Sequence, residues 1–139
     1  MNAVDTNILV YSIDKREPIK QAKAAALLHG LIASKATTVL PWQALAESVN
    51  QLRRWKDLGI LTEAEFSQHL LSWRSMFPIA FPAIAVLDHA LDLAKRYSLS
   101  HWDSMILGAC KEAAVTMLYT EDMGAPRLID QIQLVNPLI

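Results

Sequence analysis

Short apolar segments alternate along this chain with longer stretches whose apolar residues recur at helical spacing. The short segments are bounded by Pro or by small polar residues, which is typical of buried strands. They comprise the first residues of the chain and residues 37–40, 79–81, 114–119 and 133–137. The helical stretches comprise a helix of about two turns ending near residue 14, residues 19–32, 42–56, 62–76 and 83–97, and a last helix that begins after residue 100.

This alternation predicts an α/β fold with a mostly parallel sheet of four or five strands and helices on both faces. A chain of 139 residues is long enough to bury a core without disulfides or a structural metal. No internal repeat, linker or low-complexity segment divides it. We therefore expect one domain over residues 1–139.

The helical stretches also predict which side chains form the core. Apolar residues recur on one face of each helix, and such a face normally packs inward. The expected core positions are Ala22, Ala25, Ala26, Leu28, Leu31 and Ile32 in the second helix, Leu45, Val49 and Leu52 in the third, and Ile84, Leu87, Leu91 and Ala94 in the helix over 83–97.

The first strand is followed directly by the polar triplet Asp5, Thr6 and Asn7. In an open parallel sheet, ligands bind in the crevice outside the carboxyl ends of the strands, so Asp5 is a candidate functional carboxylate. Asp and Asn are also common N-caps, and the alternative interpretation is that Asp5 or Asn7 only caps the next helix.

Three further acidic residues are candidates, each with a structural alternative. Asp122 follows the strand over 114–119, as Asp5 follows the first. Glu47 lies on the polar face of the helix over 42–56, where a glutamate is often simply solvated. Asp103 comes three residues after Ser100, a spacing close to that of a capping box.

Four carboxylates that meet in one crevice would repel one another unless cations bind between them. Oxygen-rich sites of this kind suit Mg²⁺ or Mn²⁺, and such ions support phosphodiester chemistry by lowering the pKa of bound water. The sequence therefore predicts a divalent metal site built from Asp5, Glu47, Asp103 and Asp122.

Composition bears on partners and location. Thirteen basic residues against 14 acidic ones give no general electrostatic argument for nucleic acid, but 53% hydrophobic residues with only 19% charged is an apolar surplus. We expect a partner or a second copy of the chain to cover part of this surface.

The single cysteine, Cys110, lies in an apolar segment, so we expect a buried thiol. No signal sequence or membrane span is evident, and we expect a cytoplasmic protein.

The order of these motifs resembles the PIN-domain nucleases, and more narrowly the single-domain toxins of the VapBC type. The resemblance rests on residues 4–7, on Glu47, on Trp102 to Ser104 and on Thr120 to Asp122. It implies a three-layer α/β/α fold and a Mg²⁺- or Mn²⁺-dependent endoribonuclease, commonly dimeric and silenced by a cognate antitoxin. The implied site comprises the metal-binding acids Asp5, Glu47, Asp103 and Asp122 and the supporting residues Thr6, Asn7, Asn50 and Thr120.

One departure from this family pattern concerns the last acid. Many relatives follow it with a second Asp and an aromatic residue, whereas Met123 and Gly124 follow Asp122 here. Whether Glu121 shares the role of Asp122 is left open by the sequence.

For the antitoxin, we expect a groove between the helix over 19–32 and the helical hairpin over 42–76 to receive an amphipathic segment.

Other interpretations make different demands on the chain. A haloacid-dehalogenase-like phosphotransferase would need a second Asp two residues after Asp5, where the chain has Asn7. A response-regulator receiver would need paired N-terminal acids and a phosphoacceptor Asp after a middle strand, which the sequence lacks. The strongest alternative is a non-catalytic PIN module that binds RNA or a protein.

Overall fold

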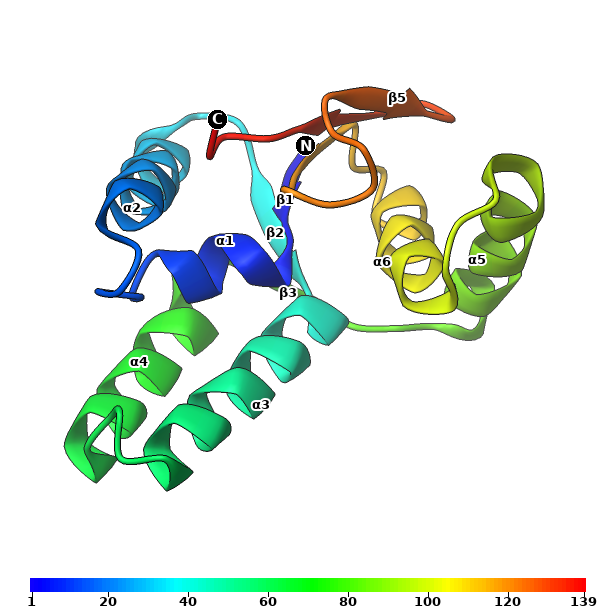
Figure 1. The fold of residues 1–139 in the computed structure, drawn as a ribbon. Helices are drawn as coiled ribbons and strands as arrows, with labels where there is room; N and C mark the ends of the chain where they lie inside the picture. Colours follow the sequence, from blue (N-terminus) through cyan, green and yellow to red (C-terminus); the bar gives the residue numbers. More distant parts are fainter.

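In the computed structural model, which describes residues 1–139, a six-stranded sheet lies between two groups of helices (Figure 1). The strand order is β3-β2-β1-β4-β6-β5. All neighbouring strands are parallel except β5, which is antiparallel to β6. The strands are β1 (Asn2–Val4), β2 (Thr38–Pro41), β3 (Ile79–Ala80), β4 (Met117–Tyr119), β5 (Arg127–Ile129) and β6 (Ile132–Val135).

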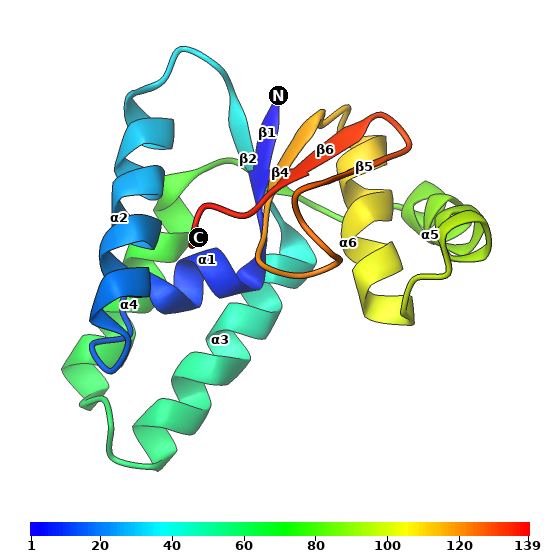
Figure 2. The ribbon, with the colours of Figure 1, turned by 45° about the horizontal axis from the view of Figure 1, so that its top comes forward.

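The helices cover both faces of this sheet, which confirms the predicted α/β class. Helices α1, α2 and α4 lie on one side and α5 and α6 on the other, while α3 extends from the carboxyl end of β2 beside α1 (Figures 1 and 2). The helices are α1 (Thr6–Tyr11), α2 (Pro18–Ala33), α3 (Trp42–Asp57), α4 (Glu63–Met76), α5 (Ile84–Tyr97) and α6 (His101–Glu112).

The register of the central strands brings distant parts of the chain to one edge of the sheet. Val4 at the end of β1 pairs with Tyr119 at the end of β4, and the next amide, Asp5 N–H, donates to the Tyr119 carbonyl at 3.0 Å. Strand β2 lies on the other side of β1 and leads directly into α3. The residues that follow β1, β2 and β4 therefore surround the same crevice.

The strand prediction was wrong in two places. The sheet has six strands rather than four or five, because three residues after Pro126 form β5 and pair with β6 across a turn at Asp130, whose φ is 55°. Strand β4 is shorter than predicted because Ala114, with φ 59°, ends α6 by donating to the Lys111 carbonyl. Residues 127–129 hold only two apolar residues, Leu128 and Ile129, between Arg127 and Asp130, so the sequence shows no apolar run or alternation that would predict a strand there.

The predicted core face of α5 is also wrong. Ile84 and Leu91 are 78% and 59% exposed, and Leu87 is exposed as well. The buried residues of this helix are Val86, Ala90 and Leu93. Helix α5 carries two apolar stripes, one with Ile84, Leu87 and Leu91 and one with Val86, Ala90 and Leu93. Helix α6 packs against the second stripe, because its small Ala90 allows the two helices to approach closely at Gly108.

Elsewhere the predicted core is partly correct. In α2 the buried side chains are Ala24, Leu28 and Leu31, whereas Ala22, Ala26 and Ile32 are exposed. Leu45 and Leu52 are buried in α3 as expected, and the Cys110 thiol is fully buried. No helix is both long enough and apolar enough to cross a membrane.

Candidate metal centre

Asp5 is the most buried of the four candidate acids, with 5% of its surface exposed. It follows β1 directly and is the N-cap of α1, because its Oδ1 accepts a hydrogen bond of 2.7 Å from Thr6 N–H. The carboxylate also lines a crevice of about 500 Å³ at the carboxyl edge of the sheet. Capping and a place in the candidate site are therefore two roles of one side chain, not alternatives.

Thr120, immediately after β4, connects two of the acids. Its buried hydroxyl donates to Asp5 Oδ2 at 2.9 Å and accepts from the Asp122 amide at 3.0 Å. The same oxygen accepts from Asn7 Nδ2 at 3.4 Å. A hydroxyl can serve one acceptor and two donors in this way, so Thr120 fixes the turn after β4 relative to Asp5.

Asn7 orients the turn from the opposite side. Its Nδ2 donates to Asp122 Oδ2 at 3.0 Å, and its Oδ1 accepts from the Glu121 amide at 3.3 Å. The Asp122 side chain itself is exposed at the rim of the crevice. Thr120 and Asn7 thus hold the turn after β4, with Asp122, against Asp5 through hydrogen bonds.

Glu121 has a different environment from Asp122. Its carboxylate accepts from Lys20 Nζ at 3.2 Å, and the same ammonium group lies 4.6 Å from the Tyr11 ring centroid and 3.3 Å from the Tyr11 hydroxyl. Although Glu121 also lines the crevice, its charge is paired with a lysine. Asp122 has no cationic partner, and this difference favours Asp122 as the acid available to a metal ion.

Glu47 and Asp103 face the crevice from α3 and α6. Glu47 Oε2 accepts from the Thr6 hydroxyl at 2.9 Å, and its Oε1 accepts from Gln43 Nε2 at 3.0 Å. The Asp103 amide donates to Ser100 Oγ at 3.3 Å, but the Asp103 carboxylate makes no hydrogen bond. A complete capping box would also have the Asp103 carboxylate accept a hydrogen bond from the Ser100 amide. This second bond is absent, so the Asp103 carboxylate is free to bind a ligand.

The electrostatics of the crevice follow from this concentration of acids. All four candidates line it, and no lysine or arginine does. Burial raises the pKa of Asp5 to about 6, with a smaller contribution from the charges of Asp122 and Glu47, while hydrogen bonds from Thr6 and Thr120 oppose the shift. At Asp122, partial burial is the largest cause of a raised pKa, and the charge of Asp103 adds to it.

This donor set fits a hard divalent cation. Mg²⁺ and Mn²⁺ prefer carboxylate oxygens and retain water ligands, so a few acids around an open crevice are sufficient. In the structure, no three acidic, histidine or cysteine side chains are close enough together to coordinate one ion. The Asp5, Glu47, Asp103 and Asp122 carboxylates would bind an ion partly through water or after a change of side-chain rotamer.

The sequence matches the model of the family described as PIN domain over residues 3–129. The chain belongs to the PIN domain family. A search of curated protein sequences gave no match. Three solved structures share the fold of this PIN domain at low sequence identity.

The first is a toxin-antitoxin complex from Klebsiella pneumoniae, with a TM-score of 0.70 and 19% identity, covering 99% of this chain and 98% of that one. The second is VapBC2 from Rickettsia felis bound to a DNA fragment from their promoter, with a TM-score of 0.73, 18% identity and 96% of each chain covered. The third is the sarcin-ricin loop cleaving toxin VapC20 from Mycobacterium tuberculosis, with a TM-score of 0.67, 13% identity and coverage of 96% and 99%.

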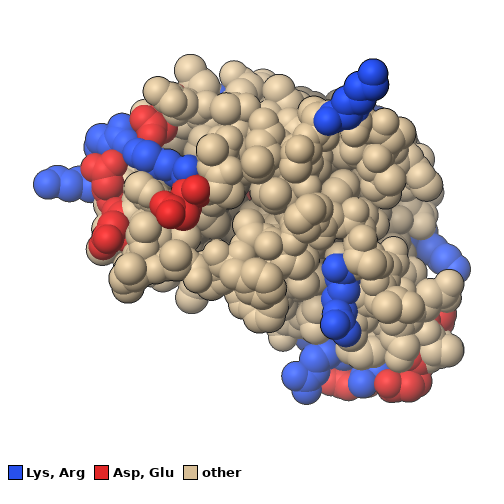
Figure 3. Space-filling model, turned by 180° about the vertical axis from the view of Figure 1, so that it is seen from behind, with Lys and Arg blue, Asp and Glu red and all other residues tan.

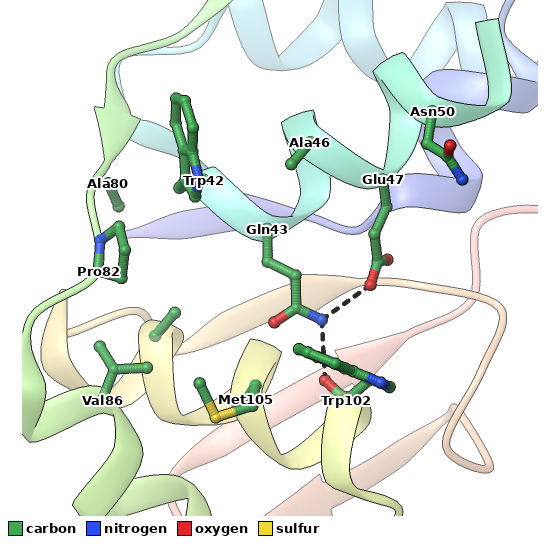
Figure 4. Close-up of a pocket in the computed structure, with 11 residues that line it drawn as sticks. Trp42, Gln43, Ala46, Glu47, Asn50, Ala80, Pro82, Val86, Trp102 and Met105 are labelled. Carbon is green, nitrogen blue, oxygen red and sulfur yellow. Dashed lines mark hydrogen bonds between the residues drawn. The ribbon is translucent and has the colours of Figure 1, made fainter. Parts of the chain in front are cut away.

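Within this PIN domain, one predicted supporting residue lies apart from the acids. Asn50 is exposed and lines an apolar pocket beside the crevice rather than the crevice itself. Two residues for which sequence reasoning gave no role, Gln43 and Trp102, line both spaces (Figure 4). The available signal was their position, because Gln43 is one helical turn before Glu47 and Trp102 directly precedes Asp103.

Proposed function

We propose that this PIN domain is a metal-dependent endoribonuclease that hydrolyses phosphodiester bonds in RNA. Asp5, Glu47 and Asp103 would hold Mg²⁺ or Mn²⁺, and Asp122 would complete the site or hold a second ion. The observation that carries the proposal is a crevice at the carboxyl edge of the sheet lined by six acidic residues. Asp14 and Glu121 are paired with Arg16 and Lys20, whereas the other four, Asp5, Glu47, Asp103 and Asp122, have no lysine or arginine partner. A divalent ion compensates this charge and would also attract a phosphate.

The chain's own residues prepare this chemistry by fixing the acids. Thr6 contacts two of them, through its amide to Asp5 and its hydroxyl to Glu47, and Thr120 holds the other oxygen of Asp5. No serine, cysteine, histidine or lysine lines the crevice, and the hydroxyls of Thr6 and Tyr11 are engaged by Glu47 and Lys20, so we assign water as the nucleophile. When bound, the divalent ion supplies Lewis acidity that lowers the pKa of water and stabilises charge on the phosphate.

We further propose that the protein is the toxin of a toxin-antitoxin pair in the cytoplasm. The Klebsiella pneumoniae and Rickettsia felis structures of similar fold are described as a toxin-antitoxin complex and as VapBC2. A groove suited to an antitoxin segment lies between α2 and α4, where the exposed Ile32 and the half-buried Met76 offer apolar surface above the buried Leu28 and Trp73. It continues through the cavity beside Ser12 and His69 to the acidic crevice.

The shape of this groove specifies the antitoxin segment. Its start is apolar, Lys15 and Arg16 line its middle, and its end is acidic, so an amphipathic helix followed by an arginine or lysine would match its two ends. The basic side chain would pair with the carboxylates and displace the metal ion. This arrangement would keep the nuclease inactive while the antitoxin is bound.

A second copy of the chain would cover a different surface. Ile84, Leu87 and Leu91 form an exposed apolar stripe on α5, away from α6. Seen from behind, few charged side chains lie across the middle of the molecule, and they gather at its left edge, the side of α5, and at its lower right (Figure 3). We propose a homodimer that buries the α5 stripe. A Leu91→Asp variant should sediment as a monomer, whereas Leu128→Asp on β5 should not change the oligomeric state.

The cleavage experiment uses purified protein and a pool of mixed RNA in Mg²⁺, in Mn²⁺ and in EDTA. We expect cleavage in either metal, none in EDTA, and a loss of at least about 100-fold for Asp5→Asn, because an inner carboxylate is removed. Asp57→Asn is the matched control, since Asp57 is exposed at the end of α3 and lines neither the crevice nor the pocket beside it. Full activity of Asp5→Asn would contradict the assignment.

The non-catalytic PIN module makes different predictions in the same experiment. It binds RNA or a partner without metal-dependent cleavage, and the four acids would then be dispensable. Co-expression with the product of the adjacent reading frame tests the toxin proposal separately. We expect co-purification and relief of toxicity, both weakened by Ile32→Asp in the α2 groove and unaffected by Ile19→Asp outside it.

A further inference from the structure

A second pocket, of about 450 Å³, adjoins the acidic crevice. It lies between the start of α3, the end of β3 and the facing sides of α5 and α6 (Figure 4). Gln43, Glu47 and Trp102 line both the pocket and the crevice, so the two spaces share a wall. Whatever binds at the carboxylates is therefore adjacent to this pocket.

Trp102 is the largest side chain in the shared wall, and 62% of it is exposed. The His101 ring lies edge-on to the indole, with ring centroids 4.6 Å apart and an interplanar angle of 73°. Gln43 Nε2 donates to the Trp102 carbonyl at 3.1 Å and to Glu47 Oε1 at 3.0 Å (Figure 4). One amide group thus fixes the position of Trp102 relative to a candidate metal ligand.

The chemistry of the pocket selects against phosphate and in favour of a neutral planar group. Most of its lining is apolar, no lysine or arginine contributes to it, and Glu47 is its only ionisable residue. Gln43 and Asn50 add amide groups that can donate to and accept from the edge of a bound ring. Aromatic platforms with a few such polar groups are how proteins hold unstacked bases of single-stranded RNA.

We propose that this pocket is a nucleobase subsite, in which the base next to the scissile phosphate stacks on the indole of Trp102. The inference rests on the proposed function for its substrate class, single-stranded RNA. The shared wall supplies the geometry, because a strand with one phosphate at the carboxylates places an adjoining nucleotide over Trp102. The subsite would then help to determine which RNA segments are cut.

The test measures RNA binding in the Asp5→Asn background, where the strand stays intact. The probe is a 12-nucleotide uridine oligoribonucleotide with one 2-aminopurine, which stacks little on uracil neighbours and whose fluorescence falls when it stacks on an aromatic ring. We expect Trp102→Ala to weaken binding about 5- to 100-fold and to abolish the fall in fluorescence. Trp102→Phe should retain both within about threefold, since a phenyl ring also stacks.

Two controls make the result specific. Leu71→Ala removes an equally exposed apolar side chain from α4, outside the pocket, and should bind like the parent protein. A ribose-phosphate oligomer without bases should bind Trp102→Ala and Trp102→Phe equally. Circular dichroism and thermal unfolding of each variant verify that the fold is retained.

Unchanged RNA affinity of a folded Trp102→Ala variant would overturn the subsite. Weaker RNA binding by Trp102→Ala accompanied by a change in oligomeric state would also overturn it, because the pocket would then be an interface between copies of the chain. The outcomes for the subsite can be distinguished from those for the proposed nuclease function. Trp102-dependent stacking in a protein that never cleaves RNA would uphold the subsite and remove the nuclease, and cleavage without Trp102-dependent binding would do the reverse.

Discussion

Thr120 Oγ1 donates a hydrogen bond of 2.9 Å to Asp5 Oδ2, although 115 positions of sequence separate the two residues. The contact exists because β1 and β4 are parallel neighbours that end in register at Val4 and Tyr119. It places a neutral donor against the most buried carboxylate of the crevice. Sheet topology thereby controls the charge state and orientation of a candidate metal ligand.

Thr120→Val removes this donor while keeping the shape of the side chain. Hydrogen bonds to charged groups contribute about 1.5–3 kcal/mol, so we expect the free energy of unfolding at pH 8 in EDTA to fall by about 2 kcal/mol. Thr120→Ser keeps the hydroxyl and should lose less than half as much. Urea denaturation measures both. Equal losses for valine and serine would show that the hydroxyl is not what matters.

Asp5 makes the stability of the metal-free protein depend on pH. Its pKa is about 6 in the folded state against an ordinary value of 3.8, so the folded state retains a proton that the unfolded state has released. The resulting stabilisation is complete below about pH 4 and is lost as pH rises through about 6, by up to about 3 kcal/mol. Asp5→Asn lacks this loss and should exceed the wild type in stability at pH 8 in EDTA.

Urea denaturation of the two proteins between pH 4 and pH 8 measures this difference. The quantity of interest is the unfolding free energy of Asp5→Asn minus that of the wild type. We expect it to increase between pH 4 and pH 7 and then to level off. A difference that stays constant with pH would mean that Asp5 ionises normally in the fold.

Asn7→Ala should weaken metal use without unfolding the protein. Asn7 holds the Asp122 carboxylate and the Glu121 amide, and loss of such an orienting residue typically reduces metal affinity by about 10- to 100-fold. The Mg²⁺ concentration for half-maximal RNA cleavage should rise accordingly. Gln131→Ala is the matched control, because the Gln131 amide is exposed in the turn between β5 and β6 and lines neither the crevice nor the pocket beside it, and it should leave the Mg²⁺ requirement unchanged.

Two glycine substitutions test the packing of the helices. A Cβ added at Gly108 would lie 2.6 Å from the Val86 carbonyl oxygen and 3.0 Å from the Ala90 nitrogen, so α5 would have to shift. We expect Gly108→Ala to cost about 1–3 kcal/mol of unfolding free energy. At Gly30, in α2, a Cβ meets nothing within 4 Å, and Gly30→Ala should stabilise by about 0.5–1 kcal/mol. Thermal denaturation should show shifts of opposite sign.

Much of the fold could be predicted because two of its signals are local in sequence. These are the helical spacing of apolar residues and the Pro or polar residues that bound the strands. The polar triplet after β1 and Thr120 after β4 correctly indicated where strands end. The inward face of α5 could not be predicted, because Ile84 and Val86 are both apolar and only the close approach of α6 at Gly108 decides between their two stripes. Strand β5 was missed because its pairing depends on a turn with φ of 55° at Asp130.

For the site, the sequence located the acids but not their partners. Strand ends and helix starts identify Asp5, Asp103 and Asp122 as neighbours once a parallel sheet is assumed. Which side chain bonds to which depends on register and rotamer. The bridge from Gln43 to Glu47 and to the Trp102 carbonyl joins α3 to α6 across 59 positions, and no local pattern encodes it.

Titration with Mn²⁺ at pH 7.5, followed by electron paramagnetic resonance, tests the central claim most directly, because it requires no knowledge of the RNA target. The wild type should bind one or two ions, Asp103→Asn should bind at least tenfold more weakly, and Asp57→Asn at the exposed end of α3 should equal the wild type. Equal Mn²⁺ binding by all three proteins would contradict a metal centre built on these carboxylates.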